Sequence, residues 1–252
     1  ALAARVGDDV VGDLIIRGLE AEGVDCSRIR RFEGHRSSYS SVYVDAVGER
    51  QIVNFRDNTL SFDAAWLAPQ LPRDFDAALG DTRWPQGATE VLRKARDIGV
   101  PGVLDAEAPS AEAREALRAA SHVAFSRQGM RDFCGHDDTL RALREVAGES
   151  GAWVCVTDGA GGVTYLSDGH ARHVPSFAVD AVDTLGAGDV WHGAFALALG
   201  EGQHEPAAVL FANAVAAIKC TRFGGRAGIP TRDEVERFLA EKGGRDGSGG
   251  VS

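Results

Sequence analysis

The residues most suited to chemistry form one short run, Gly186-Ala187-Gly188-Asp189, which opens a stretch of small and apolar residues typical of a helix. A helix N-terminus exposes unpaired N–H groups and the positive end of the helix dipole, so it attracts anions. Glycine allows the backbone to approach such an anion closely. Asp189 would repel a phosphate that is merely bound, but it is well placed to take a proton from a hydroxyl that attacks one. The run therefore indicates phosphoryl transfer.

The same run has a plainer interpretation, because Asp and Gly are common residues where helices begin. Asp189 would then be an acid of the first helical turn and nothing more. For Asp183 and Thr184, which precede the run, a role in stabilising the turn is equally open. His192 follows Asp189 by three positions and shares nearly the same helix face, where we favour a packing or supporting role.

Composition excludes several classes of protein. The chain has 252 residues, a formal net charge of −10 and a sequence pI of about 5.2, which disfavour nucleic acid and anionic membranes as partners. No apolar run approaches the ~18 residues of a membrane span. The four cysteines, which are Cys26, Cys134, Cys155 and Cys220, form no Cys-x-x-Cys pair. We therefore expect a reduced cytoplasmic protein without a zinc site or a disulfide framework.

Strands and helices are expected to alternate along most of the chain. Short apolar or alternating runs predict strands, and apolar residues recurring every three or four positions predict helices. The expected strands are residues 1–5, 40–45, 51–56, 76–81, 101–105, 122–126, 153–157 and 162–166. The expected helices are residues 10–22, 89–98, 110–120, 137–146, 187–199, 205–221 and 231–241. This order is typical of a parallel sheet covered by helices.

Two of the expected strands, 40–45 and 51–56, form a candidate β-hairpin. The intervening residues 47–49 include Gly48, and Val42, Val44 and Ile52 alternate with polar neighbours. The alternation predicts that one face of the hairpin is covered.

Longer motifs resemble a known family. Asp183-Thr184-Leu185-Gly186-Ala187-Gly188-Asp189 before a small-residue helix resembles the second signature of the PfkB (ribokinase-like) carbohydrate kinases. Residues 5–12 are similar to the family's Gly-x-Asp-x-x-Gly helix start, 40–56 to its substrate lid, 156–162 to its nucleotide loop, and 224–230 to the segment that closes the far side of that loop. Residues 48–54, 81–84 and 219–230 most resemble the sulfofructose kinase and ketohexokinase-like branch.

The resemblance, which covers almost the whole chain, implies a fold. We expect an α/β, ribokinase-like three-layer sandwich with a mostly parallel central sheet and a small β-strand lid. The kinase domain would span residues 1–242, with the lid hairpin at about 38–57 and a flexible tail at 243–252. By analogy, on the order of 50–60 residues with two strands and a sugar-holding Asp are absent, so we expect the domain to be incomplete at its N-terminus.

The resemblance also implies an activity and the residues for it. The chain would be an ATP-dependent kinase that phosphorylates a primary hydroxyl of a ketose or an anionic sugar such as 6-deoxy-6-sulfofructose. Asp189 would be the general base, and Gly186, Ala187 and Gly188 would offer N–H groups to the γ-phosphate. Arg83 would grip the anionic end of the sugar and Asn54 would hydrogen-bond it. A plain surface position is the alternative for Arg83 and for Asn54.

Nucleotide binding is expected from three further segments. Thr157 and Gly159 end an apolar strand at its carboxyl end, where open α/β sheets place ligands. A dinucleotide fingerprint is disfavoured there because the glycine spacing does not match Gly-x-Gly-x-x-Gly. The resemblance adds Asn213 near the adenine and Gly225 in the late glycine loop. For Asn213, a core polar group with its hydrogen bonds satisfied is the open alternative.

The implied cofactors are ATP and Mg²⁺, with a monovalent cation such as K⁺ left open. Many members of the family carry Asn-x-x-Glu near magnesium, but this chain has Ser126-Arg127-Gln128-Gly129 there, so no metal ligand is assigned. A homodimer that forms through the lid is expected, with the sugar and ATP as small-molecule partners. The alternatives are a nucleoside or ketodeoxygluconate kinase of the same fold, or a catalytically silent relative that binds sugar or nucleotide.

Overall fold

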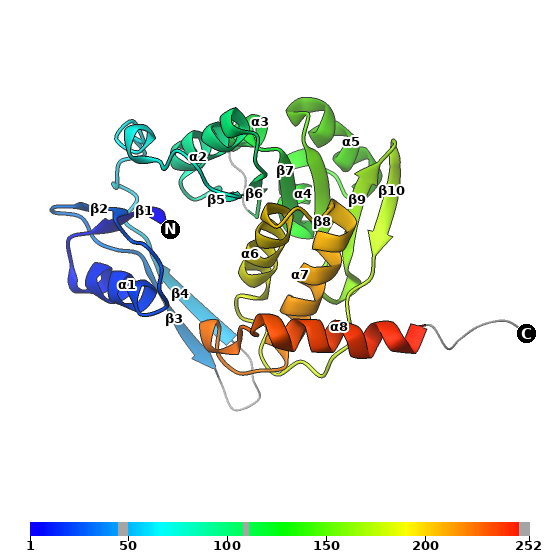
Figure 1. The fold of residues 1–252 in the computed structure, drawn as a ribbon. Coiled ribbons are helices and arrows are strands. Elements are labelled where there is room, and N and C mark those ends of the chain that lie inside the picture. The colour runs from blue at the N-terminus through cyan, green and yellow to red at the C-terminus, as the bar shows by residue number, and fades with distance from the viewer. Residues whose placement is uncertain (45–49, 108–110, 247–252) are drawn as a thin grey trace, which may run out of the picture. The chain divides into compact units, whose positions relative to one another are not determined.

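The structure of the chain is a computed structural model that describes residues 1–44, 50–107 and 111–246. The chain divides into two compact units, Ala1–Leu71 and Pro72–Ser252. The expected kinase domain of residues 1–242 therefore extends over both units (Figure 1).

The first unit begins with a strand, a helix and a second strand. β1 (Ala3–Gly7) pairs in parallel with β2 (Arg28–Phe32), and α1 (Val10–Glu20) connects them. The side chain of Asp9 caps α1 by accepting a hydrogen bond from the Gly12 N–H at 2.8 Å. The pattern analysis missed β2, because three of its five residues are arginine and hide any apolar alternation.

The first unit also contains the expected hairpin. β3 (Tyr39–Val44) and β4 (Arg50–Phe55) are antiparallel, and the predicted turn at 47–49 lies outside the described residues. The prediction of a face covered through Val42 is wrong in part, because that side chain remains 39% exposed. The opposite face carries Tyr39, Tyr43 and Val53, which are also exposed.

The second unit is built on a six-stranded sheet in the order β10-β9-β8-β7-β6-β5. Its strands are β5 (Ala78–Asp81), β6 (Gly102–Asp105), β7 (His122–Ser126), β8 (Trp153–Thr157), β9 (Val163–Ser167) and β10 (His170–Val174). β5 to β8 are parallel, whereas β9 and β10 are antiparallel to their neighbours. The sheet is mostly parallel, as expected.

Helices cover both faces of this sheet (Figure 1). One face packs against α2 (Pro85–Ile98), α3 (Arg114–Ala119), α4 (Arg127–Cys134) and α5 (Thr139–Ser150). The other packs against α6 (Ala187–Gly200), α7 (Glu205–Cys220) and α8 (Arg232–Asp246). Successive strand residues serve the two layers, since Val103 joins the α6–α7 cluster and Leu104 the cluster on the other face. The predicted three-layer α/β sandwich is confirmed.

Several boundaries differ from the expected ones. α8 continues through Asp246, so the expectation that the tail begins at residue 243 is wrong for residues 243–246, and residues 247–252 lie outside the description. The strand expected to be buried at 76–81 is β5 at the edge of the sheet, where Leu79 is 42% exposed. The helix expected at 110–120 contains a short 3-10 turn, Ala111–Ala113, followed by α3, and Ser110 is not described.

Candidate active site

The carboxyl ends of the parallel strands bring polar side chains to one edge of the sheet. β5 ends at Asp81, β6 at Asp105, β7 at Ser126 and β8 at Thr157. In open α/β sheets this edge is where ligands bind. α6, which packs on the sheet through Phe195 and Ala198, brings the glycine-rich run to it.

The first turn of α6 leaves backbone donors without acceptors. Gly186 precedes the helix with φ +73, a left-handed conformation that favours glycine. The Ala187 N–H donates to the Thr184 carbonyl at 3.2 Å, so the expected contribution of Ala187 to the anion site is not available in this conformation. The N–H groups of Gly186, Gly188 and Asp189 meet no acceptor among the described residues. Asp189 is exposed beside them.

A half-buried acid, Asp105, and a buried histidine, His192, lie next to this turn. His192 is 4% exposed, and its Nδ1 lies 2.8 Å from the Gly188 carbonyl and 3.4 Å from Oδ2 of Asp105. Both neighbours are acceptors, so the ring proton belongs on Nδ1. Burial raises the pKa of Asp105, His192 lowers it, and the charges of Glu107 and Asp189 raise it further. His192 therefore connects Asp105 to the turn that carries Asp189, which the sequence pattern did not reveal.

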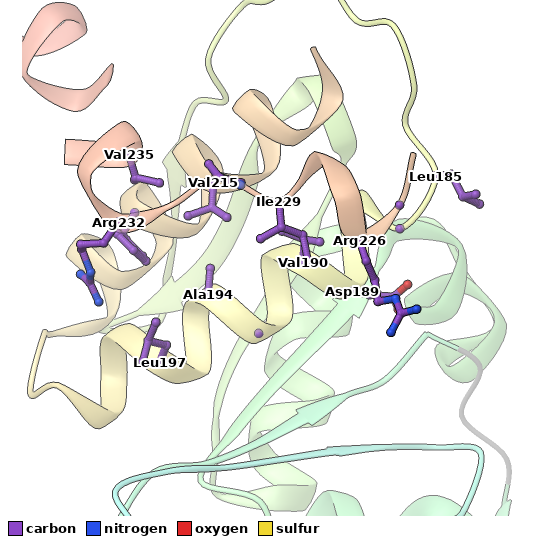
Figure 2. A pocket seen from close by; sticks show the side chains of 15 residues that line it. Leu185, Asp189, Val190, Ala194, Leu197, Val215, Arg226, Ile229, Arg232 and Val235 are labelled. Carbon is purple, nitrogen blue, oxygen red and sulfur yellow. The ribbon is translucent and has the colours of Figure 1, made fainter. Parts of the chain in front are cut away.

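A cavity of about 620 Å³ opens beside the first turns of α6. Its walls come from α6, α7, the start of α8 and the loop between α7 and α8 (Figure 2). Apolar side chains form its middle, namely Val190, Ala194, Val215, Ile229 and Val235. Such a mostly apolar cleft with a few polar groups is typical of small-molecule and cofactor sites.

The polar groups of the cavity gather at its ends. Figure 2 shows Asp189 and Arg226 at one end, near Leu185, and Arg232 at the other. Gly186 and Gly225 also line the cavity. The catalytic candidates Gly186 and Asp189 thus share a cavity with the nucleotide candidate Gly225.

The other nucleotide candidates lie outside the cavity lining. Thr157 donates its hydroxyl to the Phe125 carbonyl at 3.3 Å, and Gly159 is an exposed residue of a 3-10 turn with φ +51. Asn213 is 4% exposed; its Oδ1 accepts from Trp191 Nε1 at 2.8 Å and its Nδ2 donates to the Pro175 carbonyl at 3.0 Å. These contacts favour the core alternative for Asn213, and nucleotide contacts of all three residues stay predictions.

The two sugar-binding candidates belong to different units. Arg83 follows β5, is exposed, and lies 3.6 Å from the Glu107 carboxylate, measured from Nη2 to Oε2. Asn54 lies on β4, exposed, and its Oδ1 accepts a hydrogen bond from the Ser40 hydroxyl at 2.6 Å. Roles of Arg83 and Asn54 in sugar binding remain predictions.

The segment that replaces the family's Asn-x-x-Glu forms the start of α4. The Ser126 hydroxyl caps this helix by accepting from the Gly129 N–H at 3.0 Å. Arg127 pairs with Asp158 at 2.9 Å. Within the described residues, no group of three or more His, Cys, Asp or Glu side chains is arranged to hold a metal ion. A Mg²⁺ held mainly by phosphate oxygens and water needs only one or two carboxylates. Asp105 ends β6, and the Glu107 N–H donates to its Oδ1 at 3.1 Å, so two carboxylates lie at this edge of the sheet.

Across the helices that the structure describes, none is both long and apolar enough to cross a membrane.

The fold and the site define an α/β protein in which a helix start with unpaired N–H groups lies next to an acid. The model of the pfkB family carbohydrate kinases matches residues 1–232, and the chain belongs to this family. It is 28% identical to a ribokinase of Bacillus subtilis, over 95% of this chain and 81% of that protein. It is 30% identical to an ATP-dependent ribose-1-phosphate kinase of Halopiger xanaduensis, over 96% of this chain and 80% of that protein.

A solved structure agrees with this assignment. The crystal structure of an Agrobacterium tumefaciens protein with a provisional ribokinase assignment superposes with a TM-score of 0.85. The identity is 37%, over 94% of this chain and 79% of that one. Carbohydrate kinases of this family transfer phosphate to sugar hydroxyls, so the chain is a phosphotransferase with an alcohol group as acceptor.

Proposed function

We propose that this enzyme transfers the γ-phosphoryl group of ATP to a primary hydroxyl of a sugar, with Asp189 as the general base. The observation that carries the proposal is the first turn of α6. There, free N–H groups of Gly186 and Gly188 stand beside an exposed carboxylate at one end of an apolar cavity.

The cavity favours one orientation of a bound nucleotide. Its apolar middle suits the adenine ring, and its polar end suits the phosphates, because Arg226 and the helix start both attract anions. Free N–H groups at that end stabilise the charge that develops on the transferred group. Gly225 forms part of the same wall, and we propose that Thr157 and Gly159 contribute to the nucleotide site from its margins.

The reaction then follows from the positions of the groups. Asp189 takes the proton of the sugar hydroxyl, the hydroxyl oxygen bonds to the γ-phosphorus, and the bond to the β–γ bridging oxygen breaks, so that ADP leaves. An ordinary Asp is a weak base at neutral pH, so orientation and electrostatics supply most of the rate. The hydrogen bond from His192 to the Gly188 carbonyl holds the first turn that carries Asp189.

Magnesium belongs to this proposal as part of the nucleotide complex. When bound, Mg²⁺ neutralises phosphate charge and orients the transferred group. We propose that Asp105 and Glu107 hold it through water, because Asp105 ends β6 and Glu107 lies two residues beyond it, with its N–H hydrogen-bonded to Oδ1 of Asp105.

The sugar is the less defined partner. Arg83 favours an acceptor with an anionic group, such as sulfofructose or the ribose 1-phosphate of the Halopiger relative. A neutral ketose or ribose is the next candidate, given the ribokinase of Bacillus subtilis. We further propose that Asn54 of the hairpin helps to bind the sugar, that the hairpin joins two copies of the chain, and that the enzyme works in the cytoplasm.

ADP release with Mg²⁺–ATP across a panel of sugars, sugar phosphates, sulfofructose, nucleosides and ketodeoxygluconate tests the proposal. We expect turnover on a sugar, lowered about 10³-fold by Asp189→Asn. The matched control is Asp97→Asn, which removes the same charge from the exposed side of α2 and should leave turnover unchanged.

Other results of the panel would change the proposal. Turnover on nucleosides alone would make the chain a nucleoside kinase of the same fold. Binding of ATP or sugar without turnover on any compound would favour the silent relative. Full activity of Asp189→Asn would show that Asp189 is not the general base.

A further inference from the structure

A lysine in the last turn of α7 is completely enclosed by the second unit. Lys219 is 0% exposed, and its Nζ donates a hydrogen bond to the Asp183 carbonyl at 2.8 Å. The same Nζ lies 3.9 Å from Oδ2 of the Asp183 side chain. A buried ammonium group is costly unless it is paired and hydrogen-bonded, so this pair is a specific structural device and not a solvated surface charge.

Asp183 connects the ammonium group to both sides of the active site. Its Oδ1 accepts from the Leu185 N–H and its Oδ2 from the Gly224 N–H, each at 2.9 Å. Leu185 leads into the first turn of α6, and Gly224 precedes Gly225; both Leu185 and Gly225 line the cavity. The Lys219–Asp183 pair thus holds together the two loops between which we place the phosphates.

The backbone fixes this arrangement from the other side. The N–H groups of Val182 and Asp183 donate to the Cys220 carbonyl at 2.7 and 3.1 Å. The end of α7 therefore holds the loop before α6 by an ammonium group and by a carbonyl from adjacent residues. A shift of Lys219 would be transmitted directly to the loop that carries the free N–H groups.

The positions of these groups decide whether a monovalent cation fits here. The family resemblance leaves K⁺ open, and it implies that the region of Asp183 and Thr184 would help to form a monovalent-cation site, mainly through backbone groups. The carbonyl oxygen of Asp183 already accepts from Nζ, and both carboxylate oxygens accept backbone N–H groups. Each of these oxygens keeps a second lone pair, but a second cation that used it would be repelled by the ammonium charge that already lies against Asp183. The residues present do not fit K⁺.

We propose that Lys219 is a positioning residue that serves as a covalently attached monovalent cation, so that nucleotide binding and phosphoryl transfer need no K⁺. This inference rests on the proposed function, because it assumes that the cavity binds Mg²⁺–ATP.

The test measures binding of Mg²⁺ and adenylyl imidodiphosphate, a non-hydrolysable ATP analogue, by calorimetry. The titration is repeated in tetramethylammonium, sodium and potassium chloride at one ionic strength. We expect Kd values within about two-fold of one another, and kcat/KM for the sugar found in the panel should be equally insensitive. A Kd or kcat/KM improved about ten-fold or more by K⁺ would overturn the inference.

Lys219→Met supplies the second arm, because it removes the ammonium group and keeps a long side chain. In tetramethylammonium chloride we expect the analogue to bind at least about ten-fold more weakly, with binding regained on adding K⁺ or NH₄⁺. A purely structural lysine would not create such a cation response. Lys94→Met, on the half-buried side of α2, is the control and should show neither effect.

The outcomes separate the two proposals. Absence of analogue binding in every salt would overturn the nucleotide site and this inference with it. Binding that depends strongly on K⁺ would overturn the role of Lys219 alone. If Lys219→Met fails to fold, the wild-type salt series decides the question by itself.

Discussion

Two glycines of the candidate active site, Gly186 and Gly188, differ in why a side chain is unfavourable there. Gly186 has φ +73, so a side chain there would strain the backbone whatever the space around it. Gly188 lies within α6 with an ordinary helical backbone, and a Cβ there would meet nothing within 4 Å. That open space lies over a free N–H group, where we place the transferred phosphate. We therefore assign Gly186 to the fold of the turn and predict that Gly188 serves the reaction.

This difference predicts that stability and activity separate. Gly186→Ala should lose about 1–2 kcal/mol of unfolding free energy through left-handed strain. Gly188→Ala should be as stable as the wild type or gain up to about 1 kcal/mol, because alanine favours a helix. Its turnover should nevertheless fall about 10–100-fold, since the methyl group hinders the phosphate. Urea unfolding and ADP release measure the two effects.

A third glycine provides the control. Gly148 lies in α5 with equally open space around a Cβ, far from the cavity lining. Gly148→Ala should match Gly188→Ala in stability and keep full turnover. If Gly188→Ala is also fully active, the phosphate does not approach over that residue.

At the scale of elements, the connection between α7 and α8 forms one wall of the cavity. Its two ends are joined by Arg222, which donates to both carboxylate oxygens of Glu234 at 3.2 and 2.6 Å. Glu234 also accepts from the Thr231 N–H at 2.7 Å, which helps to begin α8. Arg222, followed by Thr231, lowers the pKa of Glu234 from 4.5 to about 2. Three residues of the cavity lie between Arg222 and Glu234, namely Gly225, Arg226 and Ile229.

The lowered pKa of Glu234 predicts that the connection between α7 and α8 is less stable at acid pH. The folded state holds the carboxylate ionised, so its stabilising effect is complete above pH 4.5 and is lost as the pH falls toward about 2. Glu234→Gln should lower the urea midpoint at pH 7. The difference from the wild type should shrink as the pH is reduced below 4.5.

Glu236 allows a matched comparison on the same helix. It is exposed on α8, so Glu236→Gln should leave the urea midpoint close to wild type at each pH. If the difference in urea midpoint between Glu234→Gln and wild type stays constant down to pH 3, the Arg222–Glu234 ion pair does not lose its stabilising effect through protonation of Glu234.

At the scale of the whole molecule, the hairpin presents an exposed face of large side chains. Tyr39, Tyr43 and Val53 lie on one face of the β3–β4 pair and are 51%, 61% and 53% exposed. Tyr39 stacks on Phe55 with ring centroids 5.4 Å apart. Contiguous exposed apolar surface is unusual in a monomer and typical of an interaction site. This face is the part of the chain through which we expect the homodimer to form.

The dimer is tested by mass in solution. Light scattering over a range of concentrations should give twice the chain mass of 26.6 kDa. The double variant Tyr43→Lys with Val53→Lys should shift the species toward one chain, because each lysine would bury an unpaired charge. Leu14→Lys, on the exposed side of α1, should remain dimeric. A wild-type monomer at every concentration would refute the expectation.

What the sequence determined by itself was the pattern of local elements and one motif. Apolar runs and glycine punctuation depend on near neighbours, so β6, β7, β8, α6 and α7 were predicted close to their observed ranges. The residue types and spacing at residues 183–189 indicated phosphoryl transfer, and the resemblance of this motif to the PfkB family indicated a carbohydrate kinase. The arginine-rich β2 was not predicted because it shows no clear apolar alternation. α4 was not predicted because its apolar residues, Met130, Phe133 and Cys134, keep the helical spacing over only eight residues.

Only the tertiary structure decided which distant residues act together. Asp105 reaches His192 from another element, and Lys219 reaches Asp183 across 36 positions of sequence. For Asn213 the sequence left a nucleotide contact and a core role open, and packing gives its amide the partners Trp191 and Pro175. Burial, pairing and the direction of a side chain are set by packing between elements, and a linear pattern does not contain that information.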